Sequence, residues 1–538
     1  MQGPTSRRIR LSKALPSLVL VGVVATTGAS ALAGCGAHPA PPPARAAVAP
    51  AKPLASAAPP PVVIRMRPSE VDDALRAEWS RASVTPSARV DDAGYLRRVT
   101  LSVTGSLPRP EKVTAFVADT SPDKRAKVVD ELLASPRYVD HMTNTWDRIL
   151  LGRDTRGANL VDRKAFRTWL HGQFDKNLPY DQLVRALVDA TGRNSDGASL
   201  DAPAAEPPLN GAVNYYLRYT DVPDLAGTTS RIFLGVQIQC AQCHDHKSEK
   251  WKTSEFHSFA ACFMRTRIDP IDRGKTMGTR RVDVRDVDHP IRLAKRMDMP
   301  DIANAPPRAL DGTDFTKSAN RRGALADWMT SKDNPWFKRE IVNRVWAQML
   351  GRGFVDPVDD FREKNPPIAP ALLDAIADDF VRGGWDLKSL IRLIAQTEAY
   401  QRAPAAGAEG AMDEKLWAHF QIQRLGPDEL LDAVMQASKL DLGGDNVNDV
   451  RTGIRKQLAF LFDVDEETDH HDEFDGTITQ ALLLMNGKIM GRAIERNGGT
   501  LTDVLALSGD EARVRALYLR TLSREPSPEE LAQATTFV

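Results

Sequence analysis

The sequence predicts a mainly α-helical protein, with two helical domains behind a lipoprotein signal and a proline- and alanine-rich tether. Apolar residues recur at helical spacing in several segments, and alternating strand patterns are scarce outside roughly residues 270–292. The connections between the helical segments are short, which favours antiparallel helix packing. We therefore expect a mainly α fold with its strands confined to one region.

The first 35 residues have the layout of a secretion signal. Basic residues between Arg7 and Lys13 precede an apolar run from about Leu15 to Leu32. The run leads into Leu-Ala-Gly-Cys35, which resembles the bacterial lipobox, where the cysteine sulfur is diacylated. A plain transmembrane anchor is the alternative, but Thr and Ser residues interrupt a run that is already short for a membrane span. We expect a lipid anchor on Cys35 and a place in the cell envelope, on the periplasmic or outer-membrane side.

Residues 36–62 are almost all Ala, Pro and Val, a composition that favours extended chain and cannot bury a core. This segment is expected to be a tether between the membrane and the globular part. The chain is 42% hydrophobic and 26% charged, and its 71 basic residues balance 71 acidic ones. Without net positive charge or a basic stripe interleaved with aromatic residues, nucleic acid is excluded as an expected partner.

Apolar stripes with helical spacing predict individual helices, and Ser-Pro or Gly residues mark where several of them stop. Within the stripe at 341–350, we expect Trp346 in the core and Arg344 in an ion pair. The stripes lie at residues 126–135, 166–174, 341–350, 372–380 and 387–394.

A polar, helix-poor stretch from Ile268 to Pro290 separates the helical segments into two groups. We expect it to belong to a connecting segment at 266–318. The two domains would then comprise residues 63–265 and 319–538.

The most informative motif is a Cys-x-x-Cys pair followed at once by histidine, at Cys240, Cys243 and His244. If residues 231–244 form a helix, these three side chains lie on one side of it. Two sulfurs so spaced could form thioethers with haem, and His244 could bind the iron. Export supports haem c as the cofactor, because such haem is attached outside the cytoplasm.

Further residues near the motif could complete a haem site. The second axial ligand would be His257, Met264 or His246, of which His246 is disfavoured because it lies only two positions from His244. Neighbouring apolar residues are expected to offer surface to the porphyrin: Phe233, Leu234, Trp251, Phe256, Phe259 and Phe263.

Two other interpretations of the motif stay open. Cys240 and Cys243 could form a disulfide or remain free thiols in an oxidising compartment. Alternatively, Cys262 could join these two cysteines and one of the nearby histidines, such as His246, in a tetrahedral site for zinc or another transition metal.

The stretch "RIFLGVQIQCAQCHDHKSEKWKTSEFHSFAACF" resembles the signature of a planctomycete cytochrome-c-like family of domains of unknown function. The segment "ALADWMTSKDNPWFKREIVNRVWAQMLGRGFVDPVDDFREKNPP" is similar to the partner domain that usually follows it. The resemblance implies an exported, haem-carrying protein whose biochemical role is unsettled. Its Cys-x-x-Cys-His-Asp-His-Lys run falls on residues 240–247, after which this chain has Ser248-Glu249 where members commonly have an aromatic residue and Asp-Pro.

Other candidate sites are weaker. The acidic stretch 463–475 surrounds His470 and His471 with carboxylates but lacks the glycine and final glutamate of an EF-hand, so we expect a solvated loop. The run "DPVDDF", with Asp356, Asp359 and Asp360, could supply paired acids for hydrolysis, although turns favour Asp in any case. We assign no catalytic residue.

Two classes of function follow from these patterns. In the first, the protein is an electron-transfer or redox module that works with other exported redox or surface proteins. In the second, it is a metal-stabilised surface scaffold or binding protein without redox chemistry.

Overall fold

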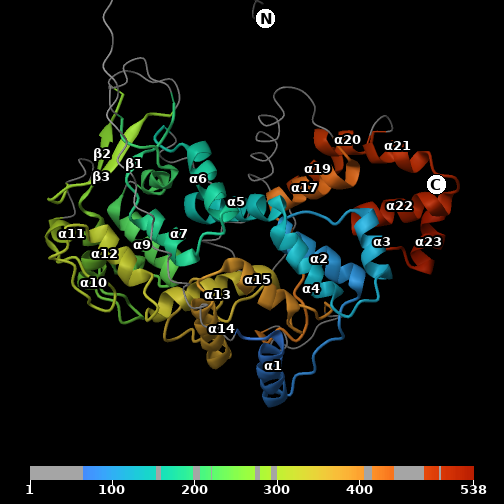
Figure 1. Cartoon of the computed structure of the whole chain (residues 1–538), viewed down its shortest axis with the longest axis horizontal. Coiled ribbons are helices and arrows are strands. Elements are labelled where there is room, and N and C mark those ends of the chain that lie inside the picture. Colours follow the sequence, from blue (N-terminus) through green and yellow to red (C-terminus); the bar gives the residue numbers. More distant parts are fainter. Residues whose placement is uncertain are drawn as a thin grey trace, which may run out of the picture. The chain divides into compact units, whose positions relative to one another are not determined.

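The computed structural model describes residues 65–152, 159–197, 206–219, 221–272, 279–291, 300–404, 415–440, 478–495 and 499–537. Residues 62–538 form one compact unit. Its described residues are mainly helical, as the sequence predicts (Figure 1).

Helices fill most of the first half of this unit. They are α1 (Pro68–Ala82), α2 (Asp92–Thr104), α3 (Pro110–Ala118), α4 (Lys124–Ala134), α5 (Pro136–Leu151), α6 (Arg163–Asp175), α7 (Tyr180–Val188), α8 (Asn214–Arg218), α9 (Val222–Leu234) and α10 (Thr253–Ala260). Short 3-10 turns lie at Gly211–Val213, Gln239–Gln242 and Ala261–Phe263.

The second half continues the helical pattern to the C-terminus. Its helices are α11 (Pro300–Asn304), α12 (Arg321–Met329), α13 (Pro335–Leu350), α14 (Pro370–Arg382), α15 (Leu387–Gln396), α17 (Pro427–Ser438), α19 (Ile478–Asn486), α20 (Lys488–Ala493), α21 (Gly499–Leu505), α22 (Asp510–Leu522) and α23 (Pro528–Thr535).

Three strands form a small antiparallel sheet in the order β1-β3-β2. These are β1 (Gly192–Arg193), β2 (Thr266–Pro270) and β3 (Val282–Asp286). On β3, Val282 and Val284 are buried and alternate with the less buried Asp283, the period of two expected for a strand with one covered face. The strands β2 and β3 lie in or beside the region where the sequence predicts them, whereas β1 was not predicted.

Each predicted helical stripe lies on a helix, namely α4, α6, α13, α14 or α15. The longest of these, α13, shows why its sequence forms a helix. The side chain of Asn334 accepts the backbone N–H groups of Trp336 and Phe337 at 3.0 and 3.2 Å, which caps the first turn. The helix ends before Gly351, whose φ of 88° is the left-handed conformation that glycine adopts easily.

Residues 231–244 do not form one helix, so the condition under which Cys240, Cys243 and His244 would share one side of a helix is not met. Helix α9 ends at Leu234 because Gly235 takes a left-handed φ of 67° and its N–H bonds back to the Arg231 carbonyl. The chain then bends and forms the separate 3-10 turn Gln239–Gln242. The Leu-Gly sequence at the bend is an ordinary helix stop signal.

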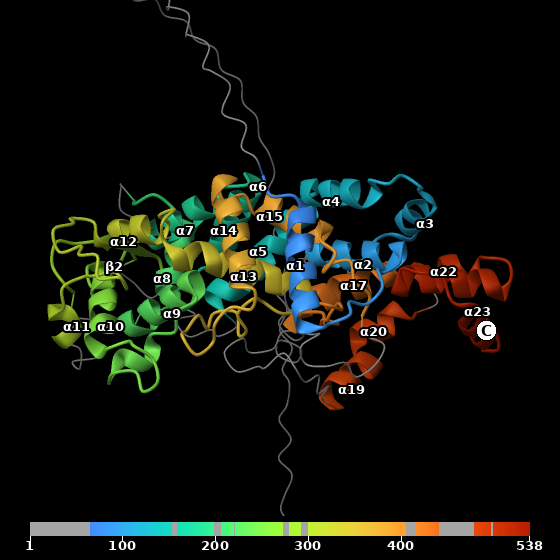
Figure 2. The same cartoon turned by 90° about the horizontal axis from the view of Figure 1, so that it is seen from below.

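The two predicted helical halves share one hydrophobic core. The buried cluster contains residues from Val71 to Ala418 and includes both sides of the segment 266–318. Helix α9 packs on α13, α7 on α12, and α4 and α1 on α15. Figure 2 shows α13 between α14 and α9, both of which it contacts. The division into domains at 266–318 stays a prediction.

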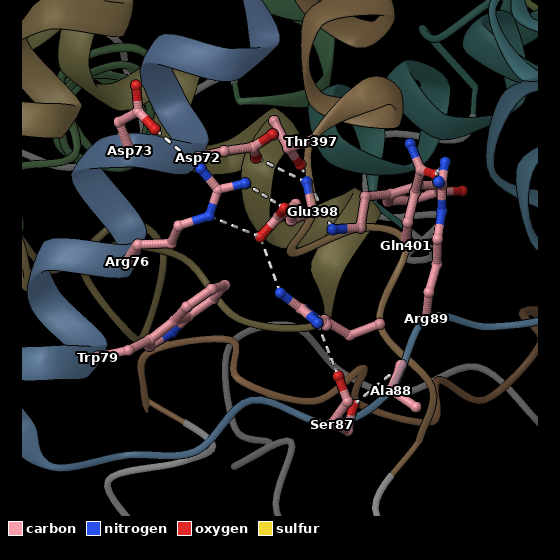
Figure 3. Close-up of polar contacts among 12 residues, drawn as sticks. Asp72, Asp73, Arg76, Trp79, Ser87, Ala88, Arg89, Thr397, Glu398 and Gln401 are labelled. Atoms are coloured by element: carbon pink, nitrogen blue, oxygen red, sulfur yellow. Dashed lines mark hydrogen bonds and ion pairs between the residues drawn. The ribbon is translucent and has the colours of Figure 1, made fainter. Parts of the chain in front are cut away.

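The N-terminal helix α1 is held to the second half by polar contacts (Figure 3). The buried carboxylate of Asp72 accepts the backbone N–H of Glu398 at 2.7 Å, and burial raises the pKa of Asp72 to about 6. Arg76 pairs with the Glu398 carboxylate, which also accepts a 2.8 Å hydrogen bond from Arg402. Trp79 donates its indole N–H to the Leu416 carbonyl at 2.8 Å. The bonds of Asp72 and Trp79 satisfy polar groups that the packing of α1 would otherwise bury unpaired.

Replacement of Gly235 by alanine tests the bend after α9. A Cβ at this position would lie 2.5 Å from a ring carbon of Phe361. We expect Gly235→Ala to lower the free energy of unfolding by roughly 2–4 kcal/mol, because left-handed strain and overpacking add. Chemical denaturation measures the loss.

Gly384→Ala is the matched control. Gly384 also has a left-handed φ, 75°, but a Cβ on this residue would have no described atom within 4 Å. The free energy of unfolding of this variant should fall only by the cost of the left-handed conformation, about 1–2 kcal/mol. Equal losses for the two variants would contradict the close packing at Gly235.

Candidate cysteine–histidine site

The Cys-x-x-Cys-His motif forms an exposed turn, which we call the CxxCH turn (residues 239–244). Cys240 and Cys243 are exposed free thiols. Between them, Ala241 is fully buried, and its N–H donates to the Ile238 carbonyl at 2.9 Å. The turn is therefore anchored by its alanine and presents both sulfurs to solvent.

The tautomer of His244 follows from its hydrogen bond. Its Nδ1 lies 2.9 Å from the carbonyl oxygen of Asp245, and a carbonyl can only accept. Nδ1 must therefore carry the hydrogen, and the neutral ring keeps its lone pair on Nε2. A histidine that donates one N–H to a carbonyl and offers its other nitrogen is the usual arrangement of a metal ligand.

The other two histidines near the motif differ from His244. In His246, Nδ1 accepts the backbone N–H groups of Ser248 and Glu249 at 3.3 and 3.1 Å. The neutral ring of His246 then carries its hydrogen on Nε2, and its lone pair is used inside the loop. In His257, Nε2 lies 3.2 Å from the carbonyl oxygen of Gln242, so this nitrogen donates and Nδ1 keeps the lone pair. Helix α10 thus supports the CxxCH turn through His257.

The chain returns from the turn to α10 by a closed loop. The backbone N–H of His246 donates to the Trp251 carbonyl at 2.8 Å, and Asp245 accepts the N–H of Thr253 at 2.9 Å. At the start of α10, the Glu255 carboxylate accepts the N–H of Lys252 at 2.8 Å. The first turn of α10 is therefore tied to the loop that carries the motif.

The apolar residues expected to face a porphyrin belong instead to the protein core, which corrects the sequence-based expectation. Each is at most 6% exposed: Phe233, Leu234, Trp251, Phe256, Phe259 and Phe263. Their hydrophobic surface is used in packing α9 and α10. The exposed residues of the CxxCH turn are Gln239, the two cysteines and His244, and the exposed residues that follow are charged or polar, beginning with Asp245 and Lys247.

Cys262 and Met264 lie in the core as well, 0% and 7% exposed. The Cys262 sulfur lies 3.8 and 3.9 Å from the carbonyl oxygens of Ser258 and Arg308. Burial raises the pKa of the Cys262 thiol to about 12, so it stays protonated. Among the described residues, no group of three His, Cys, Asp or Glu side chains is arranged to hold a metal ion.

Residues of the second half support the base of the CxxCH turn, which sequence reasoning did not find. Asp359 accepts a 2.7 Å hydrogen bond from Arg231 on α9 and a 3.3 Å bond from Gln237. The backbone N–H of Phe361 donates to the Gly235 carbonyl at 2.8 Å. No local pattern indicates these contacts, because the partners are more than 100 positions apart.

The aspartates weighed as hydrolytic acids each have an arginine partner. Asp359 pairs with Arg231, as above, while Asp356 pairs with Arg352 at 3.0 Å and Asp360 with Arg362 at 2.9 Å. Burial raises the pKa of Asp360, as do the nearby carboxylates of Asp359 and Glu249.

A buried ion pair lies under the bend at Gly235. Arg344 donates to the Glu340 carboxylate at 2.6 Å on α13, and neither side chain is more than 5% exposed. This pair confirms the predicted role of Arg344, and the 0% exposure of Trp346 confirms its place in the core. Burial raises the pKa of Glu340 to about 7, although Arg344 acts in the opposite direction.

A cavity of about 430 Å³ is lined by residues of α10 and of the segment 301–312. His257, which supports Gln242, is one of its lining residues, so a molecule bound there would touch a residue that holds the turn. The cavity is lined by Ser254, Glu255, His257, Ser258, Asp301, Ala305, Pro306, Arg308, Ala309, Leu310 and Gly312.

Two sequence-based candidates, Cys35 and the acidic stretch 463–475, lie outside the described residues. In the part of the chain that is described, no helix is both long and apolar enough to cross a membrane.

Comparison with protein families gives two matches. Residues 70–268 match PSCyt2, a protein of unknown function (DUF1549), and residues 321–457 match PSD1, a protein of unknown function (DUF1553). The two regions follow one another in the order that the sequence resemblance implies, and the CxxCH turn lies in the first. Curated proteins gave no match, and solved structures gave none either.

The raised pKa of Glu340 predicts a pH dependence of stability. Its folded pKa of about 7 lies above the ordinary value of 4.5 for a glutamate in an unfolded chain. Between these values the folded protein holds a proton that the unfolded chain releases, so this contribution to stability falls as pH rises through that window. Glu340→Gln removes the titration. We expect the stability of the natural protein relative to this variant to decrease from pH 4.5 to pH 7.

Denaturant titrations at several pH values measure this difference. Glu363→Gln, at an exposed position, controls for the loss of one carboxylate anywhere on the chain. A difference between the natural protein and Glu340→Gln that stays constant across the window would contradict the raised pKa.

Proposed function

We propose that this chain, in which a PSCyt2 region precedes a PSD1 region, is an exported, lipid-anchored protein that carries haem c on the CxxCH turn and has an electron-transfer or redox role. The observation that carries the proposal is the pair of exposed thiols followed by a histidine whose Nε2 keeps its lone pair. Thioether formation needs accessible sulfurs, and iron binding needs that lone pair.

The two exposed thiols and the available Nε2 of His244 support the attachment of haem c. Cys240 and Cys243 would hold it through thioether bonds, and His244 would bind the iron. When bound, haem supplies one-electron transfer. Two local contacts would hold these residues in place: the Asp245 carbonyl accepts a hydrogen bond from Nδ1 of His244, and buried Ala241 anchors the turn between the two cysteines.

Of the three candidates for a second iron ligand, His257 would be the one that the contacts of the turn favour. It contacts the turn directly and keeps its lone pair on Nδ1. His246 uses its lone pair within the loop, and Met264 packs in the core. Ligation by His257 would keep its existing support of Gln242, because that bond uses the other ring nitrogen.

The metal-stabilised scaffold is the alternative function. It needs Cys262 and one of the nearby histidines, such as His246, to join the two exposed cysteines around zinc or another transition metal. The complete burial of Cys262 in the core, the absence of any metal-holding group among the described residues and the occupied lone pair of His246 favour haem over this alternative.

Cysteine substitutions test the haem proposal. We expect Cys240→Ser combined with Cys243→Ser to abolish covalent haem staining, because both thioether bonds are lost. Cys262→Ala should leave the staining intact. The protein must be matured in a host with working haem-attachment machinery, and the Soret band gives an independent measurement.

The scaffold hypothesis predicts the opposite result for Cys262→Ala. Because one of four ligands is lost, this variant should release the metal or bind it much more weakly. Protein without a Soret band but with stoichiometric zinc by elemental analysis would refute the haem proposal. The same preparation thus decides between the two functions.

The lipid anchor has its own test. We expect labelled fatty acid to enter the natural protein and not Cys35→Ala, because the lipobox cysteine is the acceptor. Cys262→Ala is the matched control and should still be labelled. Full labelling of Cys35→Ala would show that the apolar run is not a lipoprotein signal.

The anchor sets where the protein works. Gly36 follows Cys35 in place of the Asp that often retains lipoproteins at the inner membrane, so we place the protein at the outer membrane if its host has one. Its partners would then be other exported redox or surface proteins.

A further inference from the structure

We infer that the PSD1 region positions the CxxCH turn, and that Asp359 is the central positioning residue. The inference assigns a role to the second region and rests on the proposed function only in taking the turn as the site. We call residues 359–361 the clamp segment.

The clamp segment acts where the chain leaves α9. At the bend, the Phe361 N–H donates to the Gly235 carbonyl at 2.8 Å. A Cβ on Gly235 would lie 2.5 Å from the Phe361 ring and 3.2 Å from the Glu340 side chain. The bend is therefore packed directly against two parts of the PSD1 region, α13 and the clamp segment.

Asp359 joins the two sides of this bend. One carboxylate oxygen accepts from Arg231 in the last turn of α9, and the other accepts from Gln237, which lies just before the CxxCH turn. Asp359 is 7% exposed, so its charged hydrogen bonds are weakly screened by water. A single carboxylate thus fixes the direction in which the chain runs from α9 to Cys240.

Asp359 is itself held in place by α13. The fully buried Asn343 donates from Nδ2 to the carbonyls of Val355 and Val358, each at 2.9 Å. Its Oδ1 accepts the N–H of Val355 at 2.9 Å. These bonds fix the loop immediately before Asp359 on a buried part of the PSD1 region.

The far end of the turn is held independently, by His257 at Gln242. The base depends on the PSD1 region, whereas the far end depends on α10 of the PSCyt2 region. Loss of Asp359 should therefore loosen residues 236–246 without unfolding α10. An independent hydrolytic role for Asp359 is less consistent with the geometry, because both of its oxygens are used in the clamp.

Hydrogen exchange of the purified, haem-free full chain tests the inference. In Asp359→Ala, we expect backbone amides of 236–246 to exchange roughly tenfold faster or more, the effect of losing a charged hydrogen bond in a local opening. Amides of α5 should exchange as in the natural protein. Asp356→Asn is the matched control, because Asp356 lies in the same loop but pairs with Arg352.

Unchanged exchange at 236–246 in Asp359→Ala would overturn the inference, and so would an equal increase in α5, which would indicate general destabilisation. If Asp359→Ala fails to fold, Gln237→Ala provides the same test at an exposed position, with a smaller increase expected. No increase in that variant would also overturn the inference.

Covalent haem staining of the same variants gives the functional measurement. We expect a lower haem yield per folded chain in Asp359→Ala than in Asp356→Asn, because the cysteines are less well positioned for attachment. If no chain carries haem, the proposed function fails, while the exchange measurement still decides the role of Asp359.

Discussion

The packing of α13 against α9 is the constraint on which the rest of the structure depends. Every residue from Glu340 to Trp346 is buried, so this helix has no solvent-facing side along that stretch. Its polar residues must therefore find partners inside the protein. Glu340 and Arg344 pair with each other, and Asn343 forms hydrogen bonds with backbone groups of the loop 355–358. The burial of the helix thus determines how the neighbouring loop is organised.

Local sequence patterns predicted the helices well but not the contacts between them. The stripe on α13 was visible because apolar spacing and a terminal glycine are local signals. The end of α9 at Gly235 could have been predicted from the same kind of signal. The Asp359–Arg231 pair could not, because its partners are 128 positions apart and nothing near either residue specifies the other.

The site shows the same division between what is local and what is not. The sequence alone showed the spacing of Cys240, Cys243 and His244. It also showed that several nearby histidines were candidate ligands. Which ring nitrogen of each histidine carries the hydrogen could not be predicted, because this depends on the backbone group to which the ring is hydrogen-bonded. Likewise, aromatic residues next to the motif suggested a porphyrin surface, but sequence alone does not say that the core already uses them.

The attachment of α1 has a consequence for the order of folding. Arg76 on α1 finds its partner Glu398 322 positions later in the chain. Synthesis from the N-terminus delivers α1 first, and the side of α1 that packs on α15 stays uncovered until most of the chain has followed. Contacts of such long sequence separation form slowly. Protection of α1 from premature association during synthesis is therefore a requirement that this fold places on the cell that makes it.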